Sequence, residues 1–384
     1  MGVMPAIQDF TDDLVAIRRD LHAHPEIGFE EVRTSEVVAD KLASWGIEVH
    51  RNVGRTGVVG ILHGTGGPGR RIGLRADMDA LPIEEITNLP WRSTKPGTMH
   101  ACGHNGHTTM LLGAARYLAE NRGFKGTAVF VFQPAEEGLG GARAMLADEL
   151  FARFPCDEIY GLHNSPYLEP GQISVSPGVA MAGADFFDIK ITGAGSHGAM
   201  PHVGRDPIMA ATALAQALQT IVSRNADPLQ AAVLSITQIH AGAAYNVIPE
   251  EATLAGTIRT FSPDLAKLVH EQMRTIAQGV ALSFGMEIGV DIRPIFNVLV
   301  NTRAEALADA ARDIVGDDKV LTAPLPMMGS EDFADMLLAV PGAYAFVGHT
   351  GRVPLHNPAF VLGEEILPIG ASLLARVVEK RLAV

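Results

Sequence analysis

Hydrophobic residues recur along the chain with two different spacings, and these spacings predict its helices and strands. Residues 7–45 carry apolar side chains at helical spacing, which His24 and Pro25 interrupt before it restarts near Glu30. We therefore expect two helices in this segment. Short apolar runs then alternate with helical stretches, which is typical of a mostly parallel sheet covered by helices on both faces.

The strands expected in this sheet are followed by polar residues. Strands are expected at residues 58–62, 71–74, 127–132 and 158–162, and a helix at 108–120. The last three strands run into polar clusters at residues 75–79, 133–137 and 163–164. Because sites in open α/β sheets form outside the carboxyl ends of the strands, we expect the three clusters to converge.

A different order of elements follows, beginning near residue 184. Strands are expected at 185–192, 232–240, 252–260 and 287–294, with helices at 206–223 and 263–284. This β-α-β-β-α-β order is that of a ferredoxin-like unit. The α/β pattern then resumes with a strand at 343–347 and a helix at 366–382.

The resumption predicts a domain inserted into another domain. We expect residues 184–297 to form the inserted α+β domain, and residues 1–183 and 298–384 to form one discontinuous α/β catalytic domain. Hinges are expected near Ala182 and Val298. A chain of 384 residues with 47% hydrophobic content is long enough for two such cores.

Charge and composition exclude several classes of protein. A net charge of -13 without a basic stripe argues against nucleic-acid binding. No basic start precedes a long apolar run, and no segment offers about 18 uncharged apolar residues, so we expect a soluble, cytoplasmic protein without a membrane partner. Cys102 and Cys156 are too few for a disulfide framework, and Cys156 is expected to serve packing.

The segment MHACGHNGHTT, residues 99–109, holds the strongest chemical signal. One glycine separates Cys102 from His104 just before a helix, so a thiolate and an imidazole can face one point. Glu136 and Glu137 follow one strand, and His163 ends the next. Each alone has a structural explanation, as a buried thiol, solvated carboxylates or a core histidine. Their joint arrival at one edge of the sheet favours a metal site.

This mixed ligand set suits zinc, manganese, nickel or cobalt, whereas calcium and magnesium prefer oxygen ligands. Two such cations about 3.5 to 4 Å apart polarise a carbonyl and lower the pKa of a bridging water to about 7. A neighbouring carboxylate can take the proton of the water and pass it to a leaving amine. One of the two adjacent glutamates must therefore remain free of the metals.

Nine segments, in order and over nearly the whole chain, resemble the metalloaminoacylase and carboxypeptidase superfamily. They are RRDLHAHPEIGFEE, LRADMDALP, MHACGHNGHT, QPAEEG, GLHN, GSHGAMPH, NVIPEEATLAGTIRTF, MGSEDFA and LHNPAF. The most similar branch includes hippurate hydrolases, indole-acetyl-amino-acid hydrolases and bacterial N-acyl-amino-acid amidohydrolases. The resemblance implies hydrolysis of small N-acyl amino acids by a phosphorylase/hydrolase-like catalytic domain that carries a ferredoxin-like lid.

The resemblance also implies the metal ligands. Cys102 would bridge two divalent cations, and His104, Glu137, His163 and His356 would complete their coordination. The expected cofactor is therefore a pair of manganese, zinc, nickel or cobalt ions per subunit.

Two acidic residues receive catalytic roles by the same resemblance. Glu136 would be the general base, and Asp77 would orient a ligand or the base. The wider superfamily has a histidine ligand two residues before this aspartate, where Arg75 stands here. That difference fits the branch in which His104 supplies the metal nitrogen.

The inserted domain would act as a lid and as a dimerisation domain, which gives a homo-oligomer, either a dimer or a tetramer. His197 resembles the lid histidine that stabilises the oxyanion of the tetrahedral intermediate. Asn246 and Arg259 resemble groups that hold the carboxylate of the substrate, and an arginine fork suits that task. The remaining histidines of note are expected either to be structural or to support the ligands without binding the metals: His22, His24, His107, His202 and His240.

Two departures from the branch concern the surroundings of the metals. Asn105 stands where the branch usually has aspartate, which keeps the shape of the side chain and removes a charge. Residues 360–364, FVLGE, replace an aromatic and acidic run. Metal preference and activity level depend on both.

Three other functions remain open. The first is an aminopeptidase or dipeptidase of the same superfamily. The second is a cysteine amidase that uses Cys102 as nucleophile and a nearby histidine as base, and the third is a small-molecule-binding homologue with impaired catalysis. Metal dependence and the effect of changing Glu136 separate these functions.

Overall fold

The computed structural model describes residues 2–383, which divide into two compact units. The first unit comprises the chain through Ala180, Val300–Pro326 and the chain from Asp332 onward. The second comprises Met181–Leu299 and Met327–Glu331. Between residues 2 and 383, no helix is both long enough and apolar enough to cross a bilayer.

The first unit is built around an eight-stranded sheet with the order β1-β2-β4-β3-β5-β16-β6-β15. Its strands are β1 (Glu48–Val53), β2 (Gly57–His63), β3 (Arg71–Asp77), β4 (Thr127–Gln133), β5 (Glu158–Ser165), β6 (Ile173–Ser174), β15 (Val320–Leu321) and β16 (Gly342–Gly348). The four central strands β4, β3, β5 and β16 run parallel, whereas β1 and β2 are antiparallel to their neighbours. The predicted mostly parallel α/β sheet is confirmed.

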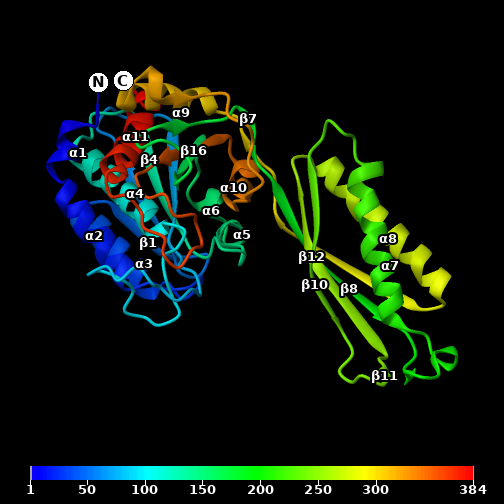
Figure 1. Cartoon of the computed structure of the whole chain (residues 1–384). Coiled ribbons are helices and arrows are strands. Elements are labelled where there is room, and N and C mark those ends of the chain that lie inside the picture. Colours follow the sequence, from blue (N-terminus) through cyan, green and yellow to red (C-terminus); the bar gives the residue numbers. More distant parts are fainter. Residues whose placement is uncertain (1, 384) are drawn as a thin grey trace. The chain divides into compact units, whose positions relative to one another are not determined.

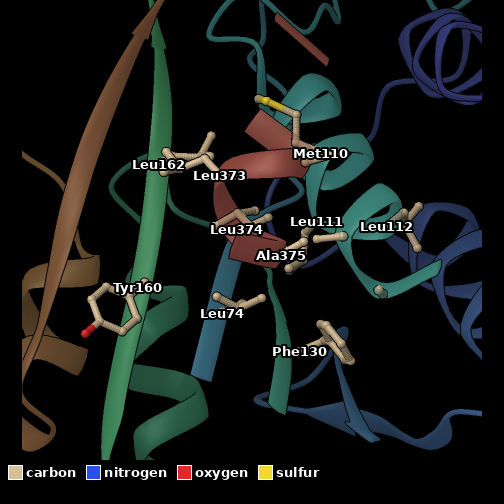
Figure 2. Close-up of a cluster of buried hydrophobic side chains, with 14 of the residues drawn as sticks. Leu74, Met110, Leu111, Leu112, Phe130, Tyr160, Leu162, Leu373, Leu374 and Ala375 are labelled. Carbon is tan, nitrogen blue, oxygen red and sulfur yellow. The ribbon is translucent and has the colours of Figure 1, made fainter. Parts of the chain in front are cut away.

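Helices cover this sheet. They are α1 (Pro5–Asp9), α2 (Thr11–Ala23), α3 (Val32–Ser44), α4 (His104–Glu120), α5 (Gly141–Ala147), α6 (Leu150–Arg153), α9 (Ala304–Val315), α10 (Phe333–Ala339) and α11 (Ile366–Arg381). Figure 2 shows Leu111 of α4 and Leu374 of α11 beside Leu74 of β3, in a core where all three are buried. This packing fixes the start of α4, which carries His104, against the sheet.

The second unit has a four-stranded antiparallel sheet with the order β10-β12-β8-β13. Its elements are β8 (Gly183–Thr192), α7 (Pro207–Thr220), β10 (Ala232–Ala241), β12 (Glu251–Thr260), α8 (Pro263–Phe284) and β13 (Glu287–Phe296). Both helices cover one face of the sheet (Figure 1). They bury a separate core that includes Phe187, Leu214 and Met273. The predicted ferredoxin-like order is confirmed.

Several short elements carry no spacing signal and are not predicted by the sequence. They are β7 (Gly178–Met181), β9 (Ser196–His197), β11 (Val247–Ile248) and β14 (Leu299–Asn301), with turns of 3₁₀ helix at Pro201–Val203 and Asp317–Lys319 and of π helix at Ile221–Asn225. The expected helix 206–223 therefore ends as α7 followed by a π turn. Strands of two to four residues are too short to show a clear alternation.

Candidate metal centre

The three polar clusters meet at one edge of the central sheet. Because β3, β4 and β5 are parallel neighbours, Asp77, Glu136 and His163 all lie at or just beyond the carboxyl ends of their strands. The loop before α4 brings Cys102 and His104 to the same edge. The convergence expected from the sequence is therefore observed.

The residues implied as metal ligands form two groups that share one thiol. The ligand atoms of Cys102, His104 and His163 lie within 4.8 Å of one another, and so do those of Cys102, Glu137 and His356. Cys102 Sγ is 3.4 Å from His163 Nε2, and His356 Nε2 is 3.3 Å from Glu137 Oε1. A thiolate between two groups of ligands is the arrangement needed to bridge two cations.

Two buried atoms in this cluster test whether a cation fits. His104 Nε2 and Glu137 Oε1 are buried, and within residues 2–383 neither makes a hydrogen bond of good geometry, although Glu137 Oε1 is ion-paired with His356. The other nitrogens of the histidine rings are engaged: His104 Nδ1 donates to Asp79 Oδ1 at 3.0 Å, and His163 Nδ1 donates to the carbonyl oxygen of Asn164 at 2.6 Å. With each Nδ1 held in this way, Nε2 is the ring nitrogen that faces the cluster and that a cation would bind.

Asp79 is a functional candidate that the sequence analysis left without a role. Its Oδ1 accepts from His104, and its Oδ2 accepts from the backbone N–H of Glu137 at 3.0 Å. One carboxylate thus fixes the ring of one ligand and the backbone of another. The sequence signal that could have found Asp79 was its place in the polar cluster of residues 75–79, just beyond the end of β3.

Asp77, which was expected to orient a ligand or the base, contacts a different set of residues. It accepts from His107 Nδ1 at 2.6 Å and pairs with Arg75 Nη1 at 2.8 Å, whereas His104 Nε2 is 3.9 Å away. Burial raises the pKa of this carboxyl group, but His104, His107 and Arg75 outweigh burial and hold the pKa well below its usual range. Asp77 is therefore a fixed negative charge beneath the cluster.

Backbone geometry at two positions sets the directions of the candidate ligands. Gly103 has φ +92°, and a Cβ there would lie 2.3 Å from Asn164 Nδ2, which donates to the carbonyl oxygen of Cys102 at 2.6 Å. Only glycine fits this turn. His356 adopts φ +64°, which is uncommon for a residue with a side chain, and its N–H donates to the carbonyl oxygen of Ala101 at 2.8 Å.

Burial shifts the pKa values of two of the candidate ligands. It raises the pKa of the Cys102 thiol, helped by the nearby Glu137 carboxylate, and it lowers the pKa of His163 to about 4. His163 is therefore neutral at pH 7 and able to ligate. The thiol, in contrast, is protonated until a cation displaces its proton, so cation binding and proton release are coupled here.

The two departures from the family pattern both have partners in the structure. Asn105 is buried, and its Nδ2 lies 3.3 Å from the carbonyl oxygen of Arg18 and 3.1 Å from His22 Nδ1. Glu364 of the FVLGE segment pairs with Arg18 at 2.6 Å and with Arg19 at 2.7 Å. Asn105 therefore keeps a contact beside His104 without a buried charge of its own.

The three residues implied for substrate binding lie in the second unit, in two places. His197 and Asn246 are neighbours, because Val247 pairs with His197 and the N–H of Gly198 donates to the carbonyl oxygen of Asn246 at 2.8 Å. Arg259 lies opposite Ala184, at the other end of β8, and donates to Ser330 Oγ at 2.5 Å. The eight residues of β8 between these ends span about 26 Å.

Comparisons with known proteins identify the family and some of its most similar members. The model of Peptidase family M20/M25/M40 matches residues 73–380. The hippurate hydrolase of Campylobacter jejuni is 41% identical over 384 residues and covers 100% of each chain. An Arabidopsis thaliana IAA-amino acid hydrolase, ILR1-like 4, is 41% identical over 379 residues, which are 96% of this chain and 85% of that protein. The crystal structure of a dinuclear metal binding peptidase from the M20 family, from Bacillus subtilis, has a TM-score of 0.85 and 37% identity, and covers 98% of this chain and 99% of that chain.

Proposed function

The chain belongs to the peptidase family M20/M25/M40, and we propose that it is a metal-dependent amidohydrolase that cleaves the amide bond of N-acyl amino acids. One observation carries this proposal. Cys102 is shared by two groups of metal-ligating atoms, and the ligand atoms of His104, Glu136 and Glu137 lie within 4.8 Å of one another beside them. A spare carboxylate next to a two-cation site is what hydrolysis by water requires.

The proposed ligands are Cys102, His104, Glu137, His163 and His356. Divalent cations bound there would polarise the amide carbonyl and make a water molecule more acidic. The sulfur and nitrogen donors favour manganese, zinc, nickel or cobalt. Among them, Cys102 gives up its proton when a cation binds, and Asp79 keeps the proton of His104 on Nδ1 so that Nε2 faces the cations.

Glu136 is proposed to move the proton. Its carboxylate is buried, accepts from the backbone N–H of Asp332 at 3.3 Å, and has an oxygen within 4.8 Å of the ligand atoms of His104 and Glu137. Glu136 takes the proton of the attacking water and delivers it to the nitrogen of the leaving amine. Asp77 supports this step by holding negative charge beneath His104.

The second unit is proposed to bind the substrate. Arg259 and Asn246 would hold the carboxylate of the amino acid, and His197 would donate to the oxyanion of the tetrahedral intermediate. Within one chain, the length of β8 separates Arg259 from His197 and Asn246. This separation supports a homo-oligomer in which a second copy supplies His197. We further propose that the enzyme works in the cytoplasm.

The proposed substrates are small and carry a free carboxylate. The names of the relatives include hippurate and IAA-amino acids, that is, an aromatic acyl group joined to an amino acid. The shared chemistry is an amide between an acyl group and the α-amino group of an amino acid. We therefore propose this class and expect the acyl pocket to decide among its members.

The test is an assay of N-acetyl, N-benzoyl and indole-acetyl amino acids with manganese, zinc or nickel, and with unblocked dipeptides beside them. We expect turnover of the acylated compounds, its loss in a strong chelator and its recovery on adding metal. Glu136→Gln should lower kcat by roughly 10²- to 10⁴-fold because it removes the proton carrier. The metal content of this variant should match that of the parent protein.

Other outcomes would favour other functions. Turnover of dipeptides alone would indicate an aminopeptidase. Activity that survives chelation but is lost on thiol alkylation in a Cys156→Ser background would indicate a cysteine amidase. Unchanged turnover by Glu136→Gln would contradict the proposed mechanism directly.

A further inference from the structure

The segment MGSEDFA reaches the candidate metal centre through Asp332, to which the proposed mechanism gives no role of its own. The backbone N–H of Asp332 donates to Glu136 Oε1 at 3.3 Å. Glu136 therefore receives a hydrogen bond from a residue almost two hundred positions away in the chain. The direction of its carboxylate depends on how firmly that amide is held.

The side chain of Asp332 holds this amide in place through three contacts. Its Oδ1 accepts from Gln133 Nε2 at 2.7 Å and pairs with Arg75 Nη2 at 3.2 Å, and its Oδ2 accepts from the N–H of Ala142 at 2.9 Å. These partners come from the end of β4, from β3 and from the start of α5. Asp332 is 1% exposed, so its carboxylate is hydrogen-bonded to these partners and not to bulk water.

Arg75 connects the contacts of Asp332 to Asp77, next to the candidate metal centre. We call Asp332, Arg75 and Gln133 the Asp332 clamp. It is fully buried and lies between Asp332 Oδ1 and Asp77 Oδ2, and its Nε donates to Gln133 Oε1 at 2.8 Å. A guanidinium group that bridges two buried carboxylates fixes the distance between them. The position of the Asp77 carboxylate is thereby linked to that of the Asp332 N–H, which donates to Glu136.

We propose that Asp332 is a positioning residue for Glu136, acting with Arg75 and Gln133. This inference rests on the proposed function, since it assumes that Glu136 moves the proton. A carboxylate that carries a proton between water and a leaving amine must be directed at both, and loss of its direction lowers the rate without removing any ligand. In this scheme Asp332 is assigned neither to the cations nor to the substrate.

The test compares Asp332→Asn with Asp335→Asn. The asparagine keeps the shape of Asp332 but removes its negative charge. Its NH₂ group also replaces one of the two oxygens that accept from the N–H of Ala142 and pair with Arg75. Asp335 is the matched control, because it is a buried carboxylate on α10 that pairs with Arg143 Nε at 2.8 Å. We expect kcat for N-benzoylglycine to fall roughly 10- to 100-fold in Asp332→Asn, with KM nearly unchanged. Asp335→Asn should keep the kcat of the parent.

A second readout separates positioning from a loss of folded protein. O-Benzoylglycolate, the ester analogue of N-benzoylglycine, has a leaving alcohol that needs less help from a proton donor than an amine. Misdirection of Glu136 should therefore lower the amide rate more than the ester rate, whereas partial unfolding would lower both by the same factor. If Asp332→Asn folds poorly, Gln133→Met is the second variant, because it removes one partner of the Asp332 carboxylate. The ratio of its amide rate to its ester rate should also be lower than in the parent protein.

The possible results are distinct. Parent-like kcat in a folded, metal-loaded Asp332→Asn, or equal losses on amide and ester, would overturn the inference while Glu136→Gln remains inactive. Failure of the proposed function would look different, because the parent protein itself would then show no metal-dependent turnover, or Glu136→Gln would retain it.

Discussion

Single side chains at the candidate metal centre take their orientation from partners that are not ligands themselves. Asp79 is the clearest case, because its two oxygens hold His104 Nδ1 and the N–H of Glu137. Replacing Asp79 with asparagine puts an NH₂ group against one of these donors. His104 can then turn, or carry its proton on Nε2, which blocks its lone pair.

We expect Asp79→Asn to weaken metal binding by roughly 10- to 100-fold, as loss of a partner of a ligating histidine typically does. Competition with a fluorescent chelator measures this affinity. Asp157→Asn is the control, because Asp157 also accepts from a backbone N–H, that of Arg71 at 2.7 Å, but at the start of β3 rather than at its end. Equal affinities in Asp79→Asn and the parent protein would show that His104 does not depend on Asp79.

The strands and helices of the first unit are tied together at the opposite end of the sheet by Glu158, the first residue of β5. This buried carboxylate pairs with Arg70 at 2.8 Å, with Arg303 at 3.2 Å and with Arg381 of α11 at 2.7 Å. Burial would raise the pKa of Glu158, but the hydrogen bonds from Arg381 and Arg70 outweigh it and lower the pKa to about 2. Glu158 is thus an anionic link between three segments.

We expect Glu158→Gln to lower the free energy of unfolding by about 2 kcal/mol at pH 7, because three arginines lose their shared anion while they remain partly open to solvent. The depressed pKa sets the pH dependence. The contribution of Glu158 is complete above its ordinary pKa of about 4.3 and is lost as pH falls toward 2. The difference between parent and variant in urea unfolding should therefore shrink below about pH 4.

Glu305→Gln is the control for this prediction. Glu305 pairs with Arg312 at 2.7 Å but is largely exposed, so its loss should change the free energy of unfolding by less than about 1 kcal/mol. A gap between parent and Glu158→Gln that stays constant from pH 7 to pH 3 would contradict the proposed ionic origin.

Most long elements with a regular spacing were predicted, although α9 was missed, and contacts between distant segments could not be predicted. The expected helix 263–284 is observed as Pro263–Phe284, because Pro263 marks its first turn and Gly285, at φ +64°, ends it. The candidate ligands were proposed from the family resemblance, and only Glu137 and His163 among them follow or end a predicted strand. The role of Asp332 was not, because its partners Gln133, Arg75 and Ala142 are set by folding and leave no local pattern.

At the scale of the whole molecule, the candidate metal ligands and the second hydrophobic core belong to different units of the chain. Cys102, His104, Glu137, His163 and His356 all belong to the first unit. The second unit has its own hydrophobic core, and its first and last strands are neighbours, with Ala184 opposite Phe296. A chain that leaves a unit beside the point where it entered can be cut there without breaking that unit.

We therefore expect residues 184–297, expressed alone, to fold into a stable α+β domain. Circular dichroism should show helix and strand with one cooperative thermal transition, and that transition should not move on adding manganese or zinc, since the candidate ligands are absent. In the full-length protein, the same metals should raise the unfolding temperature of the first unit by mass action. A fragment of residues 184–286 is the control, because it lacks β13, pairs nothing with the outer edge of β8 and should not unfold cooperatively. An unfolded spectrum for 184–297 under conditions that keep the full chain folded would show that its core needs the rest of the chain, and the predicted inserted domain would then have to be withdrawn.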